Sequence, residues 1–213
     1  MSGSSSARWR RRRERDSFAA RAIRDGYRSR AAYKLIDIDR AERLLRPGLA
    51  VLDLGAAPGS WSQYARSRVG DRGCVIAVDR LPMKPIGGVT VVPGDLGEVA
   101  LGPVLEHLRR TGVDLVISDL APNISGNAAL DQARMSELLN LVLELCVRWL
   151  VPSGVLLVKV FEGDQGASFR KQLHQCFPRV RVRKPSASRA RSREVYCVAR
   201  GFVPCVAGAA IGK

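Results

Sequence analysis

A lysine interrupts one of the most apolar stretches of the chain. The run "GVLLVKVF" at residues 154–161 is rich in aliphatic and β-branched side chains, as in a strand buried on both faces of a parallel sheet, and Lys159 is its charged residue. Removing an ammonium from water costs free energy unless it is paired or loses its proton. A lysine that reaches solvent from a strand end is the alternative interpretation. Lys159 is therefore a candidate for chemistry.

Aspartates stand at the ends of three other strand-like runs. Asp79 ends the run 74–79, "GD" at 94–95 places Asp95 after the run 89–92, and Asp119 lies in "SDLAPN" at the end of the next run. Ligands of open α/β sheets bind outside the carboxyl ends of the strands, so these carboxylates should surround one crevice. A helix cap or a turn would explain any one of them singly. Their repetition at successive strand ends favours a ligand site.

The turn "VLDLGAAPGSW" at residues 51–61 narrows the choice of ligand. Gly55 and Gly59 permit a ligand to approach the backbone closely. Their spacing is not G-x-G-x-x-G, so no pyrophosphate cradle is expected and a nicotinamide-dependent oxidoreductase is disfavoured. Carboxylates around a nucleoside pocket without a phosphate cradle suit S-adenosylmethionine, which carries a sulfonium and an amino group. Asp79 is placed to accept both hydroxyls of its ribose.

Strand-like and helical patterns alternate along almost the whole chain, which predicts one doubly wound α/β domain with a mostly parallel sheet. We expect a basic arm at residues 1–16, the domain at 17–200 and a tail of unassigned role at 201–213. The expected strands cover about 49–55, 74–79, 89–92, 113–120, 154–161, 179–184 and 194–200. Helical patterning begins near residue 17, and further helices are expected at about 30–45, 61–67, 99–110, 131–150 and 167–176.

The net charge of +15 is unevenly distributed. Residues 1–34 carry 11 Lys and Arg against 3 acidic residues, a net charge of +8, and residues 170–200 carry 10 against 1, a net charge of +9. The span 35–169 carries 13 against 16, a net charge of −3. A solvated arm or a basic surface helix would explain each cluster alone. Two separate clusters favour a nucleic-acid partner.

Composition also bears on the cellular compartment. No apolar run approaches the length needed to cross a bilayer, and the start of the chain has no apolar stretch typical of a secretory signal. A mitochondrial presequence is the alternative, and Glu14 and Asp16 argue against it. The five cysteines are odd in number and lack metal-ligand spacing, so reduced thiols, a cytoplasmic location and no bound metal are expected.

Five stretches together identify the chain as similar to a known family. These are "RSRAAYKL", "DLGAAPGSWSQY", "SDLAPNISG", "VKVF" and "KPSASRARSREVY". They resemble the FtsJ-like family of RNA ribose 2′-O-methyltransferases over about residues 5–200. The resemblance implies a Rossmann-like, S-adenosylmethionine-dependent methyltransferase fold with a seven-stranded sheet. Ser60 departs from the family pattern, since many relatives carry glycine there, and a small residue should be tolerated at this position.

The resemblance also implies the functional residues. The catalytic set of the family falls on Lys34, Asp119, Lys159 and Glu194. Its cofactor contacts fall on Gly59, Trp61, Asp79, Asp95 and Asp119. A lysine acts as a base only when neutral, a form that burial and a second nearby ammonium favour, so Lys159 would be the base and Lys34 the second cation. Positioning of the hydroxyl by a charged Lys159 is the alternative.

The implied reaction is methylation of a uridine ribose 2′-hydroxyl in 23S ribosomal RNA, on the assembled large (50S) subunit, by a monomeric enzyme. A transfer RNA 2′-O-methyltransferase of the same family and a non-catalytic RNA-binding assembly factor are the alternatives. Because the two basic segments flank Lys34 and Glu194, we expect them to form one RNA-binding surface around the reactive crevice.

Overall fold

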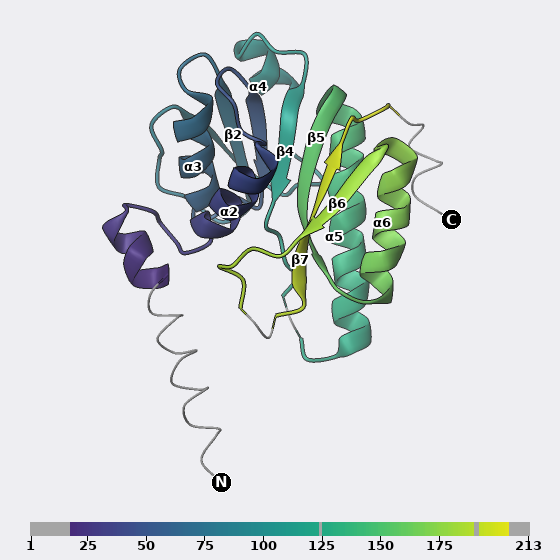
Figure 1. The fold of residues 1–213 in the computed structure, drawn as a ribbon. Helices are drawn as coiled ribbons and strands as arrows, with labels where there is room; N and C mark the ends of the chain where they lie inside the picture. Colours follow the sequence, from purple (N-terminus) through teal and green to yellow (C-terminus); the bar gives the residue numbers. More distant parts are fainter. Residues whose placement is uncertain (1–17, 124, 190–191, 205–213) are drawn as a thin grey trace.

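The computed structural model describes residues 18–123, 125–189 and 192–204, and the proposed arm at 1–16 lies outside them. Within these residues a seven-stranded sheet has the order β3-β2-β1-β4-β5-β7-β6 (Figure 1). The strands are β1 (Ala50–Leu54), β2 (Cys74–Asp79), β3 (Val89–Pro93), β4 (Val113–Ser118), β5 (Leu150–Phe161), β6 (Arg179–Arg183) and β7 (Glu194–Arg200).

The strand order reverses between β1 and β4. The first five strands pair in parallel, whereas β7 is antiparallel to both of its neighbours, β5 and β6. The predicted doubly wound, mostly parallel sheet is therefore confirmed, and β4 pairs with β5 in parallel. A reversal of this kind opens a crevice at the carboxyl ends of the strands, where ligands bind.

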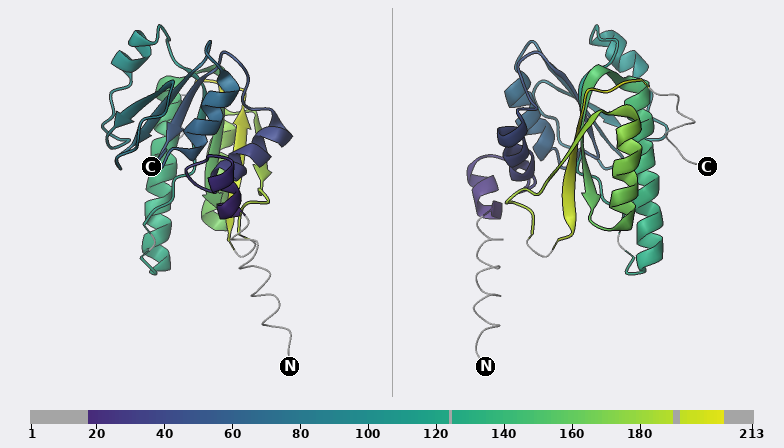
Figure 2. Two further views of the ribbon diagram at one scale, coloured as in Figure 1. Left: turned by 90° about the vertical axis from the view of Figure 1, so that its left-hand side faces the viewer. Right: turned by 45° about the vertical axis from the view of Figure 1, so that its right-hand side comes forward.

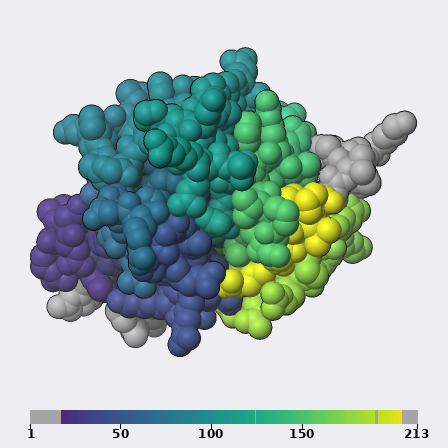
Figure 3. All heavy atoms as spheres, turned by 90° about the horizontal axis from the view of Figure 1, so that it is seen from above, coloured from purple at the N-terminus to yellow at the C-terminus, as the bar shows by residue number. Residues whose placement is uncertain are grey.

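Helices cover both faces of the sheet (Figure 2). They are α2 (Ala32–Glu42), α3 (Ser60–Val69), α4 (Gly102–His107), α5 (Ala128–Trp149) and α6 (Asp164–Cys176). Apolar side chains of α2 and α3, such as Leu35 and Ala65, form one core with β1, β2, β4, β5 and β7. Those of α4, α5 and α6, such as Leu143 and Phe169, form a second core on the opposite face. A short helical segment at 18–24 precedes α2, at the edge away from β5–β7 (Figure 3).

Several predicted boundaries differ from the structure, among them the starts of α5 and β5. Helix α5 begins at Ala128, before the predicted start, because the Asn127 side chain caps it by accepting the N–H groups of Ala129 and Leu130. Strand β5 begins at Leu150 although Pro and Gly follow within the next four residues. Pairing persists there through a register irregularity against β4, and the Ser153 N–H donates to the carbonyl of Phe202.

The cysteine prediction holds only in part. Cys74, Cys146 and Cys197 are free. Cys176 is disulfide-bonded, so the expectation of reduced thiols is wrong at that position.

Among the helices of the described residues, none is long and apolar enough to cross a membrane.

Candidate active site

Two lysines and two carboxylates meet at the carboxyl edge of the sheet. Lys34 Nζ lies 3.4 Å from Asp119 Oδ2 and 3.1 Å from Glu194 Oε1. Lys159 Nζ lies 3.1 Å from Asp119 Oδ1 and donates to the Asp119 backbone carbonyl at 2.5 Å. The Lys159 side chain is 7% exposed and that of Lys34 is 12% exposed. Two positive and two negative groups balance in charge, which offsets part of the cost of burying them.

Each member of this lysine–carboxylate cluster comes from a different element. Lys34 lies in the first turn of α2, Asp119 directly follows β4, Lys159 lies near the end of β5 and Glu194 opens β7. Because β7 runs antiparallel to β5, its first residue lies opposite Phe161, at the carboxyl end of β5. The antiparallel strand therefore brings Glu194 to the same edge as Lys159.

Tyr196 completes the cluster and was not among the predicted site residues. Its hydroxyl donates to Asp119 Oδ1 at 2.6 Å, and the Lys34 ammonium lies 5.7 Å from its ring centroid. Burial, together with the negative charge of Asp119, raises the pKa of Tyr196 well above its usual range. The hydroxyl is therefore a permanent donor to Asp119.

Asp79 at the end of β2 and Asp95 just after β3 accept hydrogen bonds from backbone N–H groups. Asp79 Oδ2 accepts the Ala57 N–H and Oδ1 accepts the Leu81 N–H, both at 2.8 Å. Asp95 Oδ1 accepts the Gly97 N–H at 3.0 Å. Each carboxylate oxygen has a second lone pair, so both side chains can still accept hydrogen bonds from a ligand.

The buried carboxyl of Asp53 interacts electrostatically with both Asp79 and Asp119. It lies in β1, is 1% exposed, and accepts a hydrogen bond of 2.6 Å from the Ser62 hydroxyl. Burial raises the pKa of Asp53 to about 7, and the charges of Asp119 and Asp79 act in the same direction. The side chains of Asp53, Asp79 and Asp119 are therefore close enough to create one region of negative electrostatic potential.

Comparison with known proteins decides the family. Residues 27–202 match the family model described as FtsJ-like methyltransferase. A protein named Ribosomal RNA large subunit methyltransferase E, from Chromohalobacter salexigens, is 51% identical over 199 residues, 93% of this chain and 95% of that protein. One of the same name from Azoarcus sp. is 54% identical over 182 residues, 85% of this chain and 89% of that protein. The chain belongs to the FtsJ-like methyltransferase family.

Two solved structures share the fold. A ribosomal RNA methyltransferase structure from Plasmodium falciparum is 29% identical, with a TM-score of 0.75, and the match covers 83% of this chain and 98% of that chain. Fibrillarin from Aeropyrum pernix, solved with bound S-adenosyl-L-methionine, is 17% identical with a TM-score of 0.56. The match covers 81% of this chain and 75% of that chain, and it supports the fold alone. The predicted Rossmann-like methyltransferase fold is confirmed.

Gly59 and Trp61, both predicted as cofactor contacts, differ in the groups that a ligand can reach. Gly59 is the N-cap of α3, with a φ of 105° that favours glycine. Trp61 is 3% exposed, and its indole N–H donates to the Ala31 carbonyl at 2.8 Å. The Trp61 side chain therefore fastens α3 to the start of α2. Its backbone N–H, in the first turn of α3, remains the group suited to a ligand.

Ser60, the departure from the FtsJ-like pattern, is accommodated by a hydrogen bond. Its hydroxyl lies 2.8 Å from that of Ser29, and the side chain is buried. The serine therefore links the segment before α2 to the start of α3. Nearby, the Arg28 guanidinium donates to the carbonyls of Pro58 and Pro85 at 3.0 and 2.7 Å.

Tyr196 and Asp53 were not predicted as residues of the candidate site, although the sequence carries a signal for each. Tyr196 follows Glu194 by two residues, and strand periodicity places both on one face. Asp53 interrupts the apolar run "AVLDL", as Lys159 interrupts its own strand. In both cases a charged or polar group in a buried strand was the available signal.

Proposed function

We propose that this FtsJ-like methyltransferase transfers a methyl group from S-adenosylmethionine to the 2′-hydroxyl of a uridine ribose in large-subunit (23S) ribosomal RNA. The observation that carries the proposal is the cluster of Lys34, Asp119, Lys159 and Glu194 around one point of the crevice. The substrate class is supported by the names of relatives that align over most of their own length. We further propose that the substrate is the assembled 50S subunit, and that the protein acts in the cytoplasm.

The residues present fit the cofactor. Asp79 keeps a free lone pair on each oxygen for the two ribose hydroxyls, because each backbone N–H occupies only one. Asp95 is available beside it for the adenine end. Burial is the main cause of the raised pKa of Asp53, and the nearby charges of Asp119 and Asp79, which act in the same direction, suit a ligand with cationic groups. When bound, S-adenosylmethionine supplies a methyl group on a positively charged sulfur, and no residue of the chain need form a covalent bond.

The lysine–carboxylate cluster would prepare the ribose hydroxyl. The hydroxyl is a weak nucleophile that must lose its proton during transfer. Lys159 is placed to take this proton, since it is buried and shares Asp119 with the Lys34 ammonium. Asp119 and Glu194 would hold the two amines in place. A Lys159 that stays charged would instead orient the 2′-oxygen by donating to it.

The test is methyl transfer by the purified chain from tritiated S-adenosylmethionine. We expect label in the large-subunit RNA of unmodified 50S subunits, at one ribose 2′-oxygen, with Lys159→Ala as the inactive control. Equal rates on a free transfer RNA would favour the transfer RNA enzyme. Absence of transfer to every RNA would favour a non-catalytic assembly factor and reject the proposal.

A further inference from the structure

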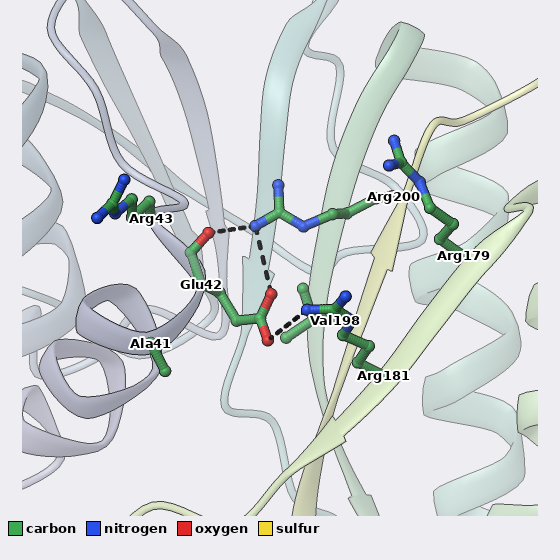
Figure 4. A pocket seen from close by; sticks show the side chains of 7 residues that line it. All are labelled: Ala41, Glu42, Arg43, Arg179, Arg181, Val198 and Arg200. Carbon is green, nitrogen blue, oxygen red and sulfur yellow. Dashed lines mark hydrogen bonds and ion pairs between the residues drawn. The ribbon is translucent and has the colours of Figure 1, made fainter.

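A cluster of arginines surrounds a buried carboxylate at the end of α2 opposite Lys34. Arg200 Nη2 lies 3.5 Å from Glu42 Oε2, Arg181 Nη1 lies 3.8 Å from Oε1, and Arg183 also pairs with Oε1. A cavity of about 330 Å³ opens between α2 and strands β6 and β7 (Figure 4). The Glu42 cluster is defined as Glu42, Arg43, Arg179, Arg181, Arg183 and Arg200.

The positive charge of the Glu42 cluster exceeds what its carboxylate requires. Five arginines against one glutamate leave a net charge of +4. The Glu42 side chain is 3% exposed, and three of the arginines pair with it. Arg43 and Arg179 line the cavity from its two sides without an ion pair from either guanidinium to any described residue (Figure 4). Neutralising Glu42 therefore explains three arginines and leaves two unexplained.

The arginines of β6 form a row that begins beside the active site. The alternation of strand side chains places Arg179, Arg181 and Arg183 on one face. In the β6–β7 register, Arg183 lies opposite Tyr196 and Arg179 opposite Arg200. The row thus runs along the sheet from the register of the active-site tyrosine toward the opposite end of β7. Arg181 is 66% exposed, so its guanidinium is accessible to a ligand despite its contact with Glu42.

The Glu42 cluster lies apart from the crevice. Lys34 and Glu42 are eight residues apart in one helix, which corresponds to about 12 Å. Glu194 and Arg200 are six residues apart in one strand, about 20 Å. Arg179 and Arg200 therefore lie away from the reactive crevice, at the far ends of β6 and β7.

We infer that the Glu42 cluster binds phosphates of the RNA backbone at a distance from the methylated nucleotide. Guanidiniums bind phosphate through paired N–H groups, and Glu42 fixes three of them in advance, which lowers the entropy cost of binding. A separation of about 12–20 Å corresponds to about four to six base-pair steps of a double helix. The bound RNA would therefore be a stem that flanks the target loop. The inference rests on the proposed function, because it takes RNA as the substrate.

The two unpaired arginines allow a test that leaves Glu42 neutralised. Arg43 has a φ of 52°, in the left-handed region, at the end of α2. Glycine suits this conformation, so Arg43→Gly removes a charge without disfavouring the fold. Arg179→Ala removes the second unpaired guanidinium. The double variant Arg43→Gly/Arg179→Ala should have an unfolding midpoint no lower than that of the parent protein.

A matched control removes the same charge from the other helix layer. Arg109 is exposed, has a φ of 53°, and lies two residues after the end of α4. Lys171 is exposed on α6. The control is therefore Arg109→Gly/Lys171→Ala. It has the same net charge as the test variant and the same change of a left-handed arginine to glycine.

Affinity is measured for a large-subunit RNA fragment with its flanking stems and for a short oligonucleotide of the target loop, over a range of salt concentrations. For the fragment, the test variant should lose about five- to tenfold in affinity per phosphate contact at 0.1 M salt, and its log–log salt slope should shrink by about two. The control should bind the fragment like the parent, and both variants should bind the oligonucleotide and S-adenosylmethionine like the parent.

Two outcomes would overturn the inference. If the test variant and the control bind the fragment equally, Arg43 and Arg179 do not contact the RNA and the inference is rejected. If the oligonucleotide loses as much affinity as the fragment, the cluster is part of the crevice. Failure of the parent protein to bind or methylate any RNA would instead reject the proposed function, so the two failures can be told apart.

Discussion

The two halves of the crevice hold their aspartates in different ways. On the β1–β3 side, Asp79 and Asp95 accept hydrogen bonds from backbone N–H groups. On the β4–β7 side, Asp119 is held by the ammoniums of Lys34 and Lys159 and by the Tyr196 hydroxyl. The first arrangement fixes carboxylates without movable protons. The second surrounds a carboxylate with groups that can release, accept or redirect a proton.

This difference divides binding from chemistry. Backbone-held carboxylates suit a ligand whose hydroxyls must be bound but not activated. Paired amines suit a hydroxyl that must lose its proton. Substitutions on the β1–β3 side should therefore change cofactor affinity, and those on the β4–β7 side should change the rate of methyl transfer at saturating cofactor.

The largest effect is expected at Lys159. Lys159→Ala removes the ammonium that contacts both the carboxylate and the backbone carbonyl of Asp119, and it should lower kcat by about 10²–10⁴-fold, the range of a lost general base. Single-turnover methylation measures the rate, and calorimetry should show unchanged S-adenosylmethionine affinity. Lys159→Arg is the sharper variant, because arginine keeps the charge but cannot act as a base. Substantial activity in Lys159→Arg would exclude the base role and leave positioning.

Asp79 should show the opposite pattern. Asp79→Ala removes the acceptor for the cofactor ribose and should weaken S-adenosylmethionine binding by about 1.5–3 kcal/mol, as for a hydrogen bond to a charged group. It also leaves the Ala57 and Leu81 N–H groups without their acceptor, so Asp79→Asn, which keeps one carbonyl oxygen, should lose less. At saturating cofactor, kcat should stay close to that of the parent. Unchanged affinity in Asp79→Ala would show that the cofactor lies elsewhere.

The strand pattern made most of the fold predictable. Apolar runs separated by helical periods gave the seven strands and their mostly parallel pairing, because period and burial act locally. The antiparallel orientation of β7 could not be read from its residues alone, since a strand with both faces buried looks alike in either direction. Helix α4 begins later than expected, because the Val99 N–H donates to the Asp95 carbonyl in a turn that precedes the helix.

The site was less predictable from local signals than the fold. Lys159 drew attention because a charge in a buried strand costs free energy. Lys34 and Glu194 carried no such signal, since each lies where a surface residue would be unremarkable, and only family resemblance selected them. Their contact of 3.1 Å depends on how α2 crosses the end of β7, which is a property of the tertiary packing. The role of the Trp61 indole was likewise decided by its partner on α2.

Asp53 should make stability depend on pH. Its pKa of about 7 in the folded protein lies above the ordinary value of 3.8, mainly because of burial. Below about pH 4 the carboxyl is protonated in both the folded and unfolded states, and as pH rises through 7 the folded state loses stability relative to the unfolded state. Asp53→Asn cannot ionise, so its stability relative to the parent should improve by about 1–3 kcal/mol between pH 4 and pH 8. Urea unfolding measures this, and a pH-independent difference would contradict it.

The smallest effect is expected from Tyr196→Phe, a positioning residue on the β4–β7 side. The variant removes one of three side-chain donors to Asp119 but keeps the ring packed 5.9 Å from Trp61, so the unfolding midpoint should change little. We expect kcat to fall about three- to tenfold, a cost of about 1 kcal/mol for one hydrogen bond, with cofactor affinity unchanged. Tyr64→Phe is the matched control, since the Tyr64 hydroxyl donates to Asp39 at 2.8 Å in the α2–α3 layer, and it should leave kcat unchanged. If both variants lower kcat equally, the effect comes from packing, and the division of the crevice into a binding half and a chemical half loses its support at Tyr196.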